Sequence, residues 1–409
     1  MQRDQPDLKV ALNRQQRLRN VKALLLVAPA LLFILAGFIV PIALTLYKAV
    51  ENSELSRVLP RVHDAIRQWD GKGLPDERVY AAIAQDLKIA FGERTLGIPG
   101  RRLNLEIPGF ANLLQTTGRR LASTAEPIAS HRELLEQVDR RWAEPRYWQA
   151  IRRAASAWTD FYFLAAFDLK RDTGDAIVPV AEDQRLYLDV LGRSLWVSLC
   201  VTGLCLLIAY PISFTMSTLS PGLANVALMM VLLPFWTSVL VRTSAWFVLL
   251  QKEGLINGTL LSIGLISAPE SLMFNRFGVV IALSHVLLPY MVLTLYAVMK
   301  GIDPQYVRSA ASLGANPWQV FHRVYLPQVL PGVAAGCLLV FILALGSYVT
   351  PALVGGRHDQ MIAYFIAFNV NQTVNWGLAA ALSTLLLAVV LALYPLYGRF
   401  AGVNRAGAA

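Results

Sequence analysis

Residues that commonly carry enzyme or metal chemistry are few and scattered in this sequence. It contains no G-x-x-x-x-G-K-[ST] phosphate loop, so the chain cannot hydrolyse ATP itself. The cysteines fall within apolar stretches and lack metal spacing; they are Cys200, Cys205 and Cys337. The histidines form no metal-spaced pair and no Ser/His/Asp arrangement; they are His63, His131, His285, His322 and His358. We therefore expect no catalytic residue, no metal and no cofactor, and we do not expect an enzyme.

The polar residues with the most informative spacing lie in the segment 303–327, DPQYVRSAASLGANPWQVFHRVYLP, between two apolar stretches. Asp303 predicts a helix start because its side chain can accept hydrogen bonds from free backbone N–H groups, and Pro304 suits the first helical position. Gly314 predicts the end of that helix, since glycine readily adopts a positive φ.

A second helix start follows this glycine at once. Asn316 is the expected N-cap and Pro317 the first helical residue, while Gln319 can complete a capping box with Asn316. Small side chains between Ser309 and Ser312 precede the turn, and they allow another protein's surface to approach the backbone. A short amphipathic helix of this kind can bind in a groove on a partner.

The segment resembles the EAA loop of permease subunits of binding-protein-dependent ABC importers. That loop carries Glu-Ala-Ala, a glycine three residues later and Leu-Pro about a dozen residues beyond. The matching positions are Ala310, Ala311, Gly314, Leu326 and Pro327. Ser309 stands where the family usually has Glu. The resemblance implies an ATPase-coupling surface formed by these residues together with Asn316 and Pro317.

The composition is that of an integral membrane protein. Of 409 residues, 55% are hydrophobic and only 16% are charged, whereas a soluble domain is about a quarter charged. The net charge is +10, but residues 48–187 hold 21 Lys or Arg and 20 Asp or Glu, so a charge of +9 lies in the apolar part and its tails. This distribution indicates membrane topology and no nucleic-acid partner.

We predict an all-α integral membrane fold with six transmembrane helices, one N-terminal and five in a permease core. Each apolar run is near the roughly 20 residues that a bilayer requires, and the first is longer than a signal-peptide core. The expected spans are Ala23–Tyr47, 190–218, 223–250, 277–300, 328–352 and 377–399. Breaks are expected at prolines within or at the ends of the spans, namely Pro211, Pro234, Pro289, Pro351 and Pro395.

Between the first two spans, the sequence changes to amphipathic helical patterns separated by turn signals. The expected domains are 1–47, a basic cytoplasmic arm with the first span; 48–187, a large helical periplasmic insertion; and 188–409, the permease core with its coupling loop at 303–327. Six spans and the positions of Lys and Arg place both termini in the cytoplasm.

Residues 186–400 also resemble the polyamine branch of importer permeases, through segments such as LLPFWTSVLVRTSAW and GSYVTPALVGG. The resemblance implies a multi-pass protein of the bacterial inner membrane that imports a small cationic solute, such as putrescine or spermidine, or a related amine or amino acid. It further implies three partners besides lipid: a second homologous permease, a dimer of ATP-binding subunits and a periplasmic solute-binding protein.

Arg242 is the one basic residue well inside an expected span. It is either a pathway or gating residue, or an arginine that is structurally paired or snorkels to the membrane surface.

No Asp or Glu lies in the middle of a span. A cationic solute would therefore be held by aromatic faces and dipoles, or by acids on a partner. The aromatic candidates, for which packing or an interfacial position is the alternative, are Trp236, Tyr290, Tyr348 and Tyr364.

Two other classes of function are alternatives for such an apolar chain. An ion-coupled secondary carrier would take up solute without ATPase partners, but it usually needs an intramembrane carboxylate. A membrane anchor or sensor would keep its function without spans four to six. Neither accounts for the glycine turn in 303–327. An importer of the same type for a different cargo is a further alternative.

Overall fold

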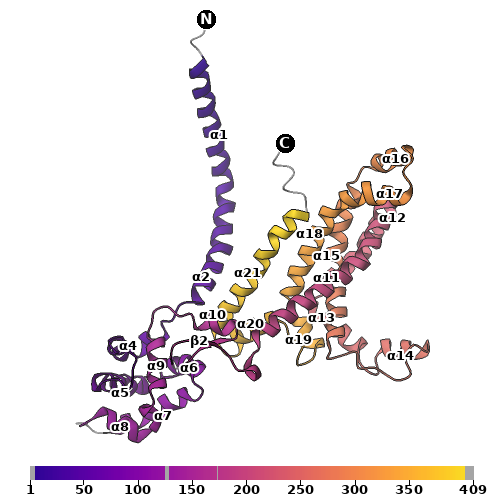
Figure 1. Ribbon diagram of the computed structural model, residues 1–409. Coiled ribbons are helices and arrows are strands. Elements are labelled where there is room, and N and C mark those ends of the chain that lie inside the picture. The colour runs from indigo at the N-terminus through magenta and orange to yellow at the C-terminus, as the bar shows by residue number, and fades with distance from the viewer. Residues whose placement is uncertain (1–4, 125–128, 173, 401–409) are drawn as a thin grey trace. The chain divides into compact units, whose positions relative to one another are not determined.

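The structure is a computed structural model in two compact units, Met1–Asp160 and Phe161–Ala409, which are described separately (Figure 1). The described residues are 5–124, 129–172 and 174–400. Residues 1–4 and 401–409, which belong to the expected cytoplasmic arm and permease core, lie outside the described residues.

The first unit begins with one long apolar helix. α1 (Gln5–Ile34) continues through a π-helical turn, η1 (Leu35–Ile39), into α2 (Val40–Lys48). Its large apolar side chains are exposed, as bilayer-facing side chains would be. The stretch Gln15–Lys48 is long and apolar enough to cross a membrane, and it contains the expected span Ala23–Tyr47.

The rest of the first unit is a small helical domain, as its turn-separated amphipathic patterns predict. Its elements are α3 (Glu54–Val58), α4 (Pro60–Ile66), α5 (Glu77–Gly92), α6 (Gly97–Glu106), α7 (Phe110–Ala122), α8 (His131–Val138), the 3-10 turn η2 (Arg140–Ala143) and α9 (Pro145–Ala154). Polar N-caps start two of the helices: Asp76 accepts the N–H of Val79 at α5, and Ser130 accepts that of Glu133 at α8.

Two tryptophans form the centre of this domain. Trp142 and Trp148 are fully buried with ring centroids 5.1 Å apart, and the Tyr80 ring lies 4.5 Å from Trp148. The Tyr80 hydroxyl and the Trp148 indole both donate to the Trp142 carbonyl oxygen at 2.9 Å. The Trp142 indole donates to the Thr117 hydroxyl at 3.0 Å. The core therefore buries large aromatic area without leaving these polar groups unpaired.

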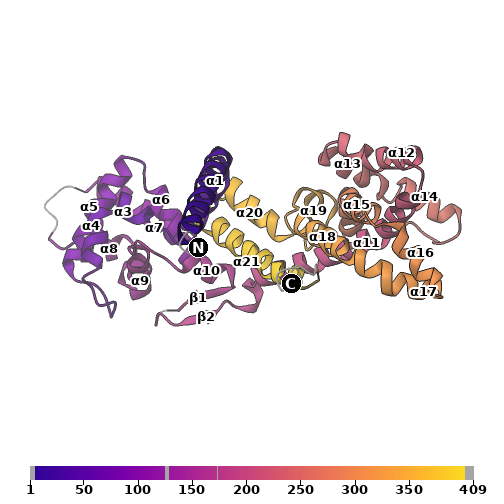
Figure 2. The same cartoon turned by 90° about the horizontal axis from the view of Figure 1, so that it is seen from above.

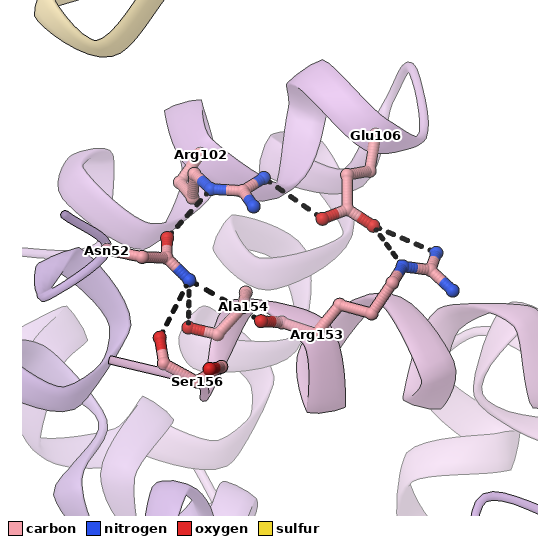
Figure 3. A network of polar contacts seen from close by, with 6 residues as sticks. All are labelled: Asn52, Arg102, Glu106, Arg153, Ala154 and Ser156. Carbon is pink, nitrogen blue, oxygen red and sulfur yellow. Dashed lines mark hydrogen bonds and ion pairs between the residues drawn. The ribbon is translucent and has the colours of Figure 1, made fainter. Parts of the chain in front are cut away.

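A buried polar network joins the two ends of the domain (Figure 3). The Asn52 amide donates to three backbone carbonyl oxygens between Arg153 and Ser156 at 2.9–3.4 Å, which ties the chain before α3 to the chain after α9. The Asn52 side-chain oxygen accepts from Arg102 at 3.0 Å. Arg102 is buried and pairs with Glu106 at 3.0 Å, and Glu106 also pairs with Arg153 at 2.9 Å.

In the second unit, a short segment precedes the membrane helices. It consists of α10 (Phe161–Ala166), an antiparallel hairpin of β1 (Leu169–Arg171) and β2 (Ile177–Pro179), and the 3-10 turn η3 (Glu182–Gln184). Lys170 pairs with Val178 at the centre of the hairpin. The sequence patterns, which indicate helices in this region, did not predict the hairpin.

Asp168 joins this segment to the first long helix of the second unit. Its buried carboxylate accepts hydrogen bonds from three successive backbone N–H groups, at 186–188, over 2.8–3.1 Å. It thereby caps α11 (Tyr187–Thr218) from outside that helix. α10 also packs on α21 (Trp376–Phe400). Residues 161–187, which the sequence groups with the insertion, thus pack with the permease core.

α11, α15 (Arg276–Lys300) and α18 (Leu326–Leu345) lie side by side and form the core of the second unit (Figures 1 and 2). Gly332 lets α18 approach α15, because a Cβ there would lie 2.7 Å from Cγ2 of Val298. The hydroxyl of Ser213 on α11 donates to a carbonyl of α15, that of Val292, at 3.0 Å. Close backbone approach and interhelical hydrogen bonds are the interactions that hold helices together in lipid.

The third expected span is sharply bent. α12 (Pro221–Leu232) and α13 (Val239–Leu249) meet at 93° across the 3-10 turn η4 (Leu233–Trp236). Pro234 has no N–H to continue α12, and the Ser238 hydroxyl caps α13 by accepting the N–H of Val241. The break expected at Pro234 is confirmed.

Other helices continue through their prolines, so the breaks expected at Pro211, Pro289 and Pro395 are wrong. A proline inside a helix leaves nearby carbonyl groups without an N–H partner. Near Pro289, side chains of α11 and α13 bond the carbonyl groups of Ser284 and Val286. These contacts join α15 to its two neighbouring helices beside the proline.

The fifth expected span ends early, at Leu345 instead of 352. The chain turns at Gly346, before a short new helix that contains Pro351, so the break lies ahead of the proline. The shorter helices of the unit are α14 (Leu255–Ser262), α19 (Val349–Val354) and α20 (Ile362–Asn371). Among the described residues, five helices are long and apolar enough to cross a membrane, or six if the bent α12–α13 pair is one span.

We predict that Glu106→Gln destabilises the helical domain by about 3 kcal/mol, because it removes the carboxylate that pairs with the buried charge of Arg102. Glu136→Gln is the matched control. Glu136 also pairs with an arginine four residues earlier, Arg132, at 2.9 Å, but both side chains are partly exposed, and such pairs contribute about 0.3–0.5 kcal/mol. Thermal unfolding of the purified chain, followed by tryptophan fluorescence, measures both. Equal shifts in the two variants would contradict a stabilising role for the buried pair.

Candidate coupling surface and solute path

The first half of segment 303–327 forms α16 (Pro304–Ser312) and the predicted glycine turn. The Asp303 carboxylate accepts a backbone N–H in the first turn of α16 at 2.8 Å. Gly314 has a φ of +86°. Its N–H bonds the carbonyl of Ala311 at 3.0 Å, and the next N–H bonds the carbonyl of Ala310 at 3.2 Å. This pair of bonds is the Schellman arrangement, which needs a left-handed residue at the position of the glycine.

The second half begins at the predicted capping box. The Asn316 side chain accepts the N–H of Gln319 at 2.8 Å, and the Gln319 side chain accepts the N–H of Asn316 at 3.1 Å. α17 (Pro317–Val320) then passes through a π-helical turn, η5 (Phe321–Tyr325), directly into α18. The turn at Gly314 is therefore bounded by bonded caps on both sides, which restricts the angle between the two helices.

Leu326 and Pro327 lie in the first turn of α18, inside a continuous helix. The N–H of Leu326 bonds the carbonyl of Phe321, five residues earlier, as in a π turn. Pro327 has no N–H, and the wide turn before it accommodates the missing bond. The helix therefore runs from Pro317 to Leu345, and it is long and apolar enough to cross a membrane.

The helix–turn–helix presents large apolar side chains to solvent. Leu313 is 89% exposed and Trp318 67%, and Tyr306 is exposed as well. Among the predicted coupling residues, Ser309 is exposed and Ala310 half-buried. Contiguous apolar side chains on a polar segment mark a surface that another protein covers.

A cavity of about 530 Å³ lies beneath this surface. Phe214 of α11 and Met299 of α15 line it together with Ala311, Pro317 and other residues of the helix–turn–helix. The coupling segment is thus seated over the C-terminal ends of two core helices, as the position of α16 and α17 at one end of the unit also shows (Figure 1).

Three of the five predicted path residues gather where η4 and α13 meet α15. Trp236, at the end of η4, is 90% exposed, and the ring of its neighbour Phe235 lies 4.9 Å from that of Tyr290. Arg242 of α13 donates to the carbonyl of Val286 at 3.4 Å. Its Nε is buried and has no hydrogen-bond partner within the described part of the chain. The arginine is therefore anchored to α15 at one nitrogen and incompletely bonded at another.

The other two predicted path residues lie on separate elements. Tyr348 begins α19, and α19 is joined to α13 through the hydroxyls of Thr243 and Thr350, 3.0 Å apart. Tyr364 lies on α20, where it stacks on Phe368 of the same helix. The structure thus links Tyr348 to the group around Arg242 through α19, and it places Tyr364 apart from that group.

Charged residues at the other end of the unit were not singled out from the sequence. Arg276, at the start of α15, lies 3.4 Å from Asp359, and Arg193 of α11 donates to the carbonyl of His358. These contacts attach the loop before α20 to two core helices. The sequence shows positive and negative residues at the ends of the apolar runs. It does not show which of them pair across runs that are far apart in the chain.

The second unit thus combines helices long and apolar enough to cross a membrane with an exposed helix–turn–helix that is continuous with one of them. Residues 204–400 match the family of binding-protein-dependent transport system inner membrane components. The spermidine/putrescine transport system permease protein PotB of Haemophilus influenzae is 37% identical over 212 residues, which cover 51% of this chain and 74% of that protein. The chain belongs to this family and is a multi-pass permease subunit of an ABC importer.

Other relatives and structures match over the same region. PotB of Escherichia coli is 34% identical, covering 51% of this chain and 77% of its own. The molybdenum transport system permease protein ModB of Mycobacterium bovis is 32% identical, covering 47% and 71%. A crystal structure of a bacterial alginate ABC transporter with its alginate-bound periplasmic protein aligns with a TM-score of 0.41 at 20% identity, covering 52% and 77%.

Proposed function

We propose that this permease forms a solute pathway with a second homologous permease, that a dimer of separate ATP-binding subunits drives it, and that a periplasmic solute-binding protein supplies its cargo. The observation that carries the proposal is the exposed turn at Gly314, which is capped on both sides and continuous with α18. Family membership supports the set of partners. One copy of six spans would provide half a pathway.

The proposed cargo is a small cationic solute of the polyamine class, such as putrescine or spermidine. Relatives at 34–37% identity are named for these two solutes, and they support the assignment. The more distant molybdenum permease makes a different cargo the alternative. Since no acidic residue lies in the middle of the apolar runs, aromatic rings and backbone dipoles would contact a cation.

We further propose six spans with both termini cytoplasmic, in which the bent α12–α13 pair counts as one. The coupling segment lies at the C-terminal ends of α11 and α15. The segment 161–186 lies at the opposite end, where Asp168 caps the N-terminus of α11. If the turn at Gly314 contacts a cytoplasmic ATPase, the insertion 48–187 is therefore periplasmic.

In the proposed mechanism, closure of the ATP-binding subunits displaces α16 and α17 together, because the Schellman and capping-box bonds fix their angle. The displacement passes through η5 into α18 and tilts the core helices around the path. The proposed path residues are Arg242, Trp236, Tyr290, Tyr348 and Tyr364. Coupling between sites is reciprocal, so a loaded binding protein should raise ATPase activity.

Gly314→Asp is expected to lower uptake of labelled putrescine about tenfold or more in cells that contain the assembled transporter. A Cβ at this position meets nothing within 4 Å, so the effect arises from the left-handed φ, at about 1–2 kcal/mol, and from a charge on the coupling surface. Gly301→Asp is the control, because Gly301 has a φ of −80°, which any residue can adopt, and the substitution adds the same charge nearby. Normal uptake by Gly314→Asp at normal membrane abundance would contradict the coupling role.

Ser309→Glu restores the residue that the importer family usually carries. If Ser309 faces the ATPase, the new carboxylate should change the affinity for the ATP-binding subunits severalfold, as a charge pair at a protein interface does. Ser312→Glu, on the same helix, is the charge-matched comparison. Affinity is measured by titrating purified ATP-binding subunit onto the reconstituted permease. No difference between Ser309→Glu and the unchanged chain would remove Ser309 from the interface.

Arg242→Gln should alter the KM of uptake severalfold at unchanged membrane abundance, because glutamine keeps a donor for the Val286 carbonyl but removes the charge. Lys252→Gln makes the same charge change just beyond α13 and should leave KM unaltered. Uptake kinetics are compared with immunoblots of the membrane fraction. An unchanged KM with reduced abundance would assign Arg242 to helix packing alone.

A further inference from the structure

The helical domain of the first unit carries a cavity of about 560 Å³ with an unusual lining. Three basic and three hydroxyl side chains contribute to it, and no acidic side chain does among the described residues. These six residues are His63, Arg67, Arg152, Ser53, Ser56 and Ser156. A concave site with this lining favours a multivalent oxyanion, because guanidinium and hydroxyl groups both donate hydrogen bonds to phosphate oxygens.

Among the basic residues of the cavity, His63 lies 2.9 Å from the carboxylate of Asp64, whereas the two arginines have no carboxylate partner in the described structure. Arg67 is exposed, and its guanidinium forms no hydrogen bond or ion pair there. Arg152 donates to the backbone carbonyl of Asp70 at 2.9 Å, a contact that positions the guanidinium without neutralising it. The nearby carboxylate of Glu51 is occupied by ion pairs with Lys48 and Arg57. Two guanidinium charges therefore remain available to a ligand.

The cavity lies next to the end of the long apolar helix. Trp158 lines the cavity and is 60% exposed, and its ring lies 5.6 Å from that of Tyr47 in an edge-to-face arrangement. Tyr47 is the penultimate residue of the stretch Gln15–Lys48 that is able to cross a membrane. Tyr and Trp gather at the boundary between hydrocarbon and water. The cavity is therefore at the level of lipid headgroups wherever this helix spans a bilayer.

We propose that this cavity binds the phosphate group of an anionic phospholipid. Arg67 and Arg152 contact the phosphate oxygens, the hydroxyl of Ser156 supplies a further donor, and Trp158 lies against the glycerol and upper acyl region. A zwitterionic lipid binds more weakly, because the lining offers no carboxylate for its ammonium group. The inference rests on the proposed membrane crossing by α1 and α2, and it is independent of cargo and ATPase.

The test uses the full-length chain in detergent and native mass spectrometry to titrate phosphatidylglycerol and phosphatidylcholine of matched acyl chains. The unchanged chain should bind one phosphatidylglycerol at least tenfold more tightly than phosphatidylcholine. The double variant Arg67→Gln/Arg152→Gln should lose this preference to within twofold. Arg119→Gln/Arg120→Gln removes the same charge from exposed positions on α7 and should retain the preference.

Arg67→Gln alone guards against misfolding, because the Arg67 guanidinium makes no hydrogen bond or ion pair in the described structure. It should weaken phosphatidylglycerol binding severalfold with an unaltered near-ultraviolet circular dichroism spectrum. Inorganic phosphate at millimolar concentration should not displace the lipid. Equal affinity for the two lipids, full binding by the double variant, or displacement by inorganic phosphate would each overturn the proposal. None of these readouts requires uptake or ATP, so failure of the importer assignment would be seen separately.

Discussion

Backbone polar groups that lipid cannot hydrogen-bond impose the main constraint on the second unit. In two places a side chain from another element bonds backbone groups of a long helix. The three N–H groups that begin α11 bond the carboxylate of Asp168, and the carbonyl of Val286 near Pro289 accepts from Arg242. Such pairing is required wherever irregular backbone lies at membrane depth. The side chains that bond these backbone groups also join elements that are distant in sequence, so the same contacts serve hydrogen bonding and tertiary packing.

The same requirement explains why the turn at Gly314 is held in one conformation. Gly314 adopts a conformation that other residues avoid, yet the bonds to Ala310 and Ala311 on one side and the Asn316 capping box on the other leave few alternatives. The helix that begins after the turn continues through η5 into α18. A contact made by Leu313 or its neighbours is thereby linked to a core helix without an intervening loop, which suits a subunit that has no ATP-binding loop of its own.

The helical domain of the first unit is held together by contacts between its chain ends and by an aromatic core. Its chain ends are brought together by the Asn52 amide, and its centre is filled by Trp142 and Trp148 with their polar tips bonded. The buried pair of Arg102 and Glu106 is stabilising only because further hydrogen bonds complete it, since an isolated buried charge is expensive.

Sequence alone determined the features that depend on local chemistry. The caps at Asp303 and Asn316, the turn at Gly314 and the apolar runs follow from residue type and spacing, and the structure has each of them. Tertiary structure decided what depends on distant partners: which prolines interrupt a helix, that Asp168 caps α11, and which side chains meet around Arg242. The carboxylate of Asp168 and the charge of Arg242 are visible in the sequence, but their backbone partners lie on other elements, and only folding brings those groups within hydrogen-bond distance.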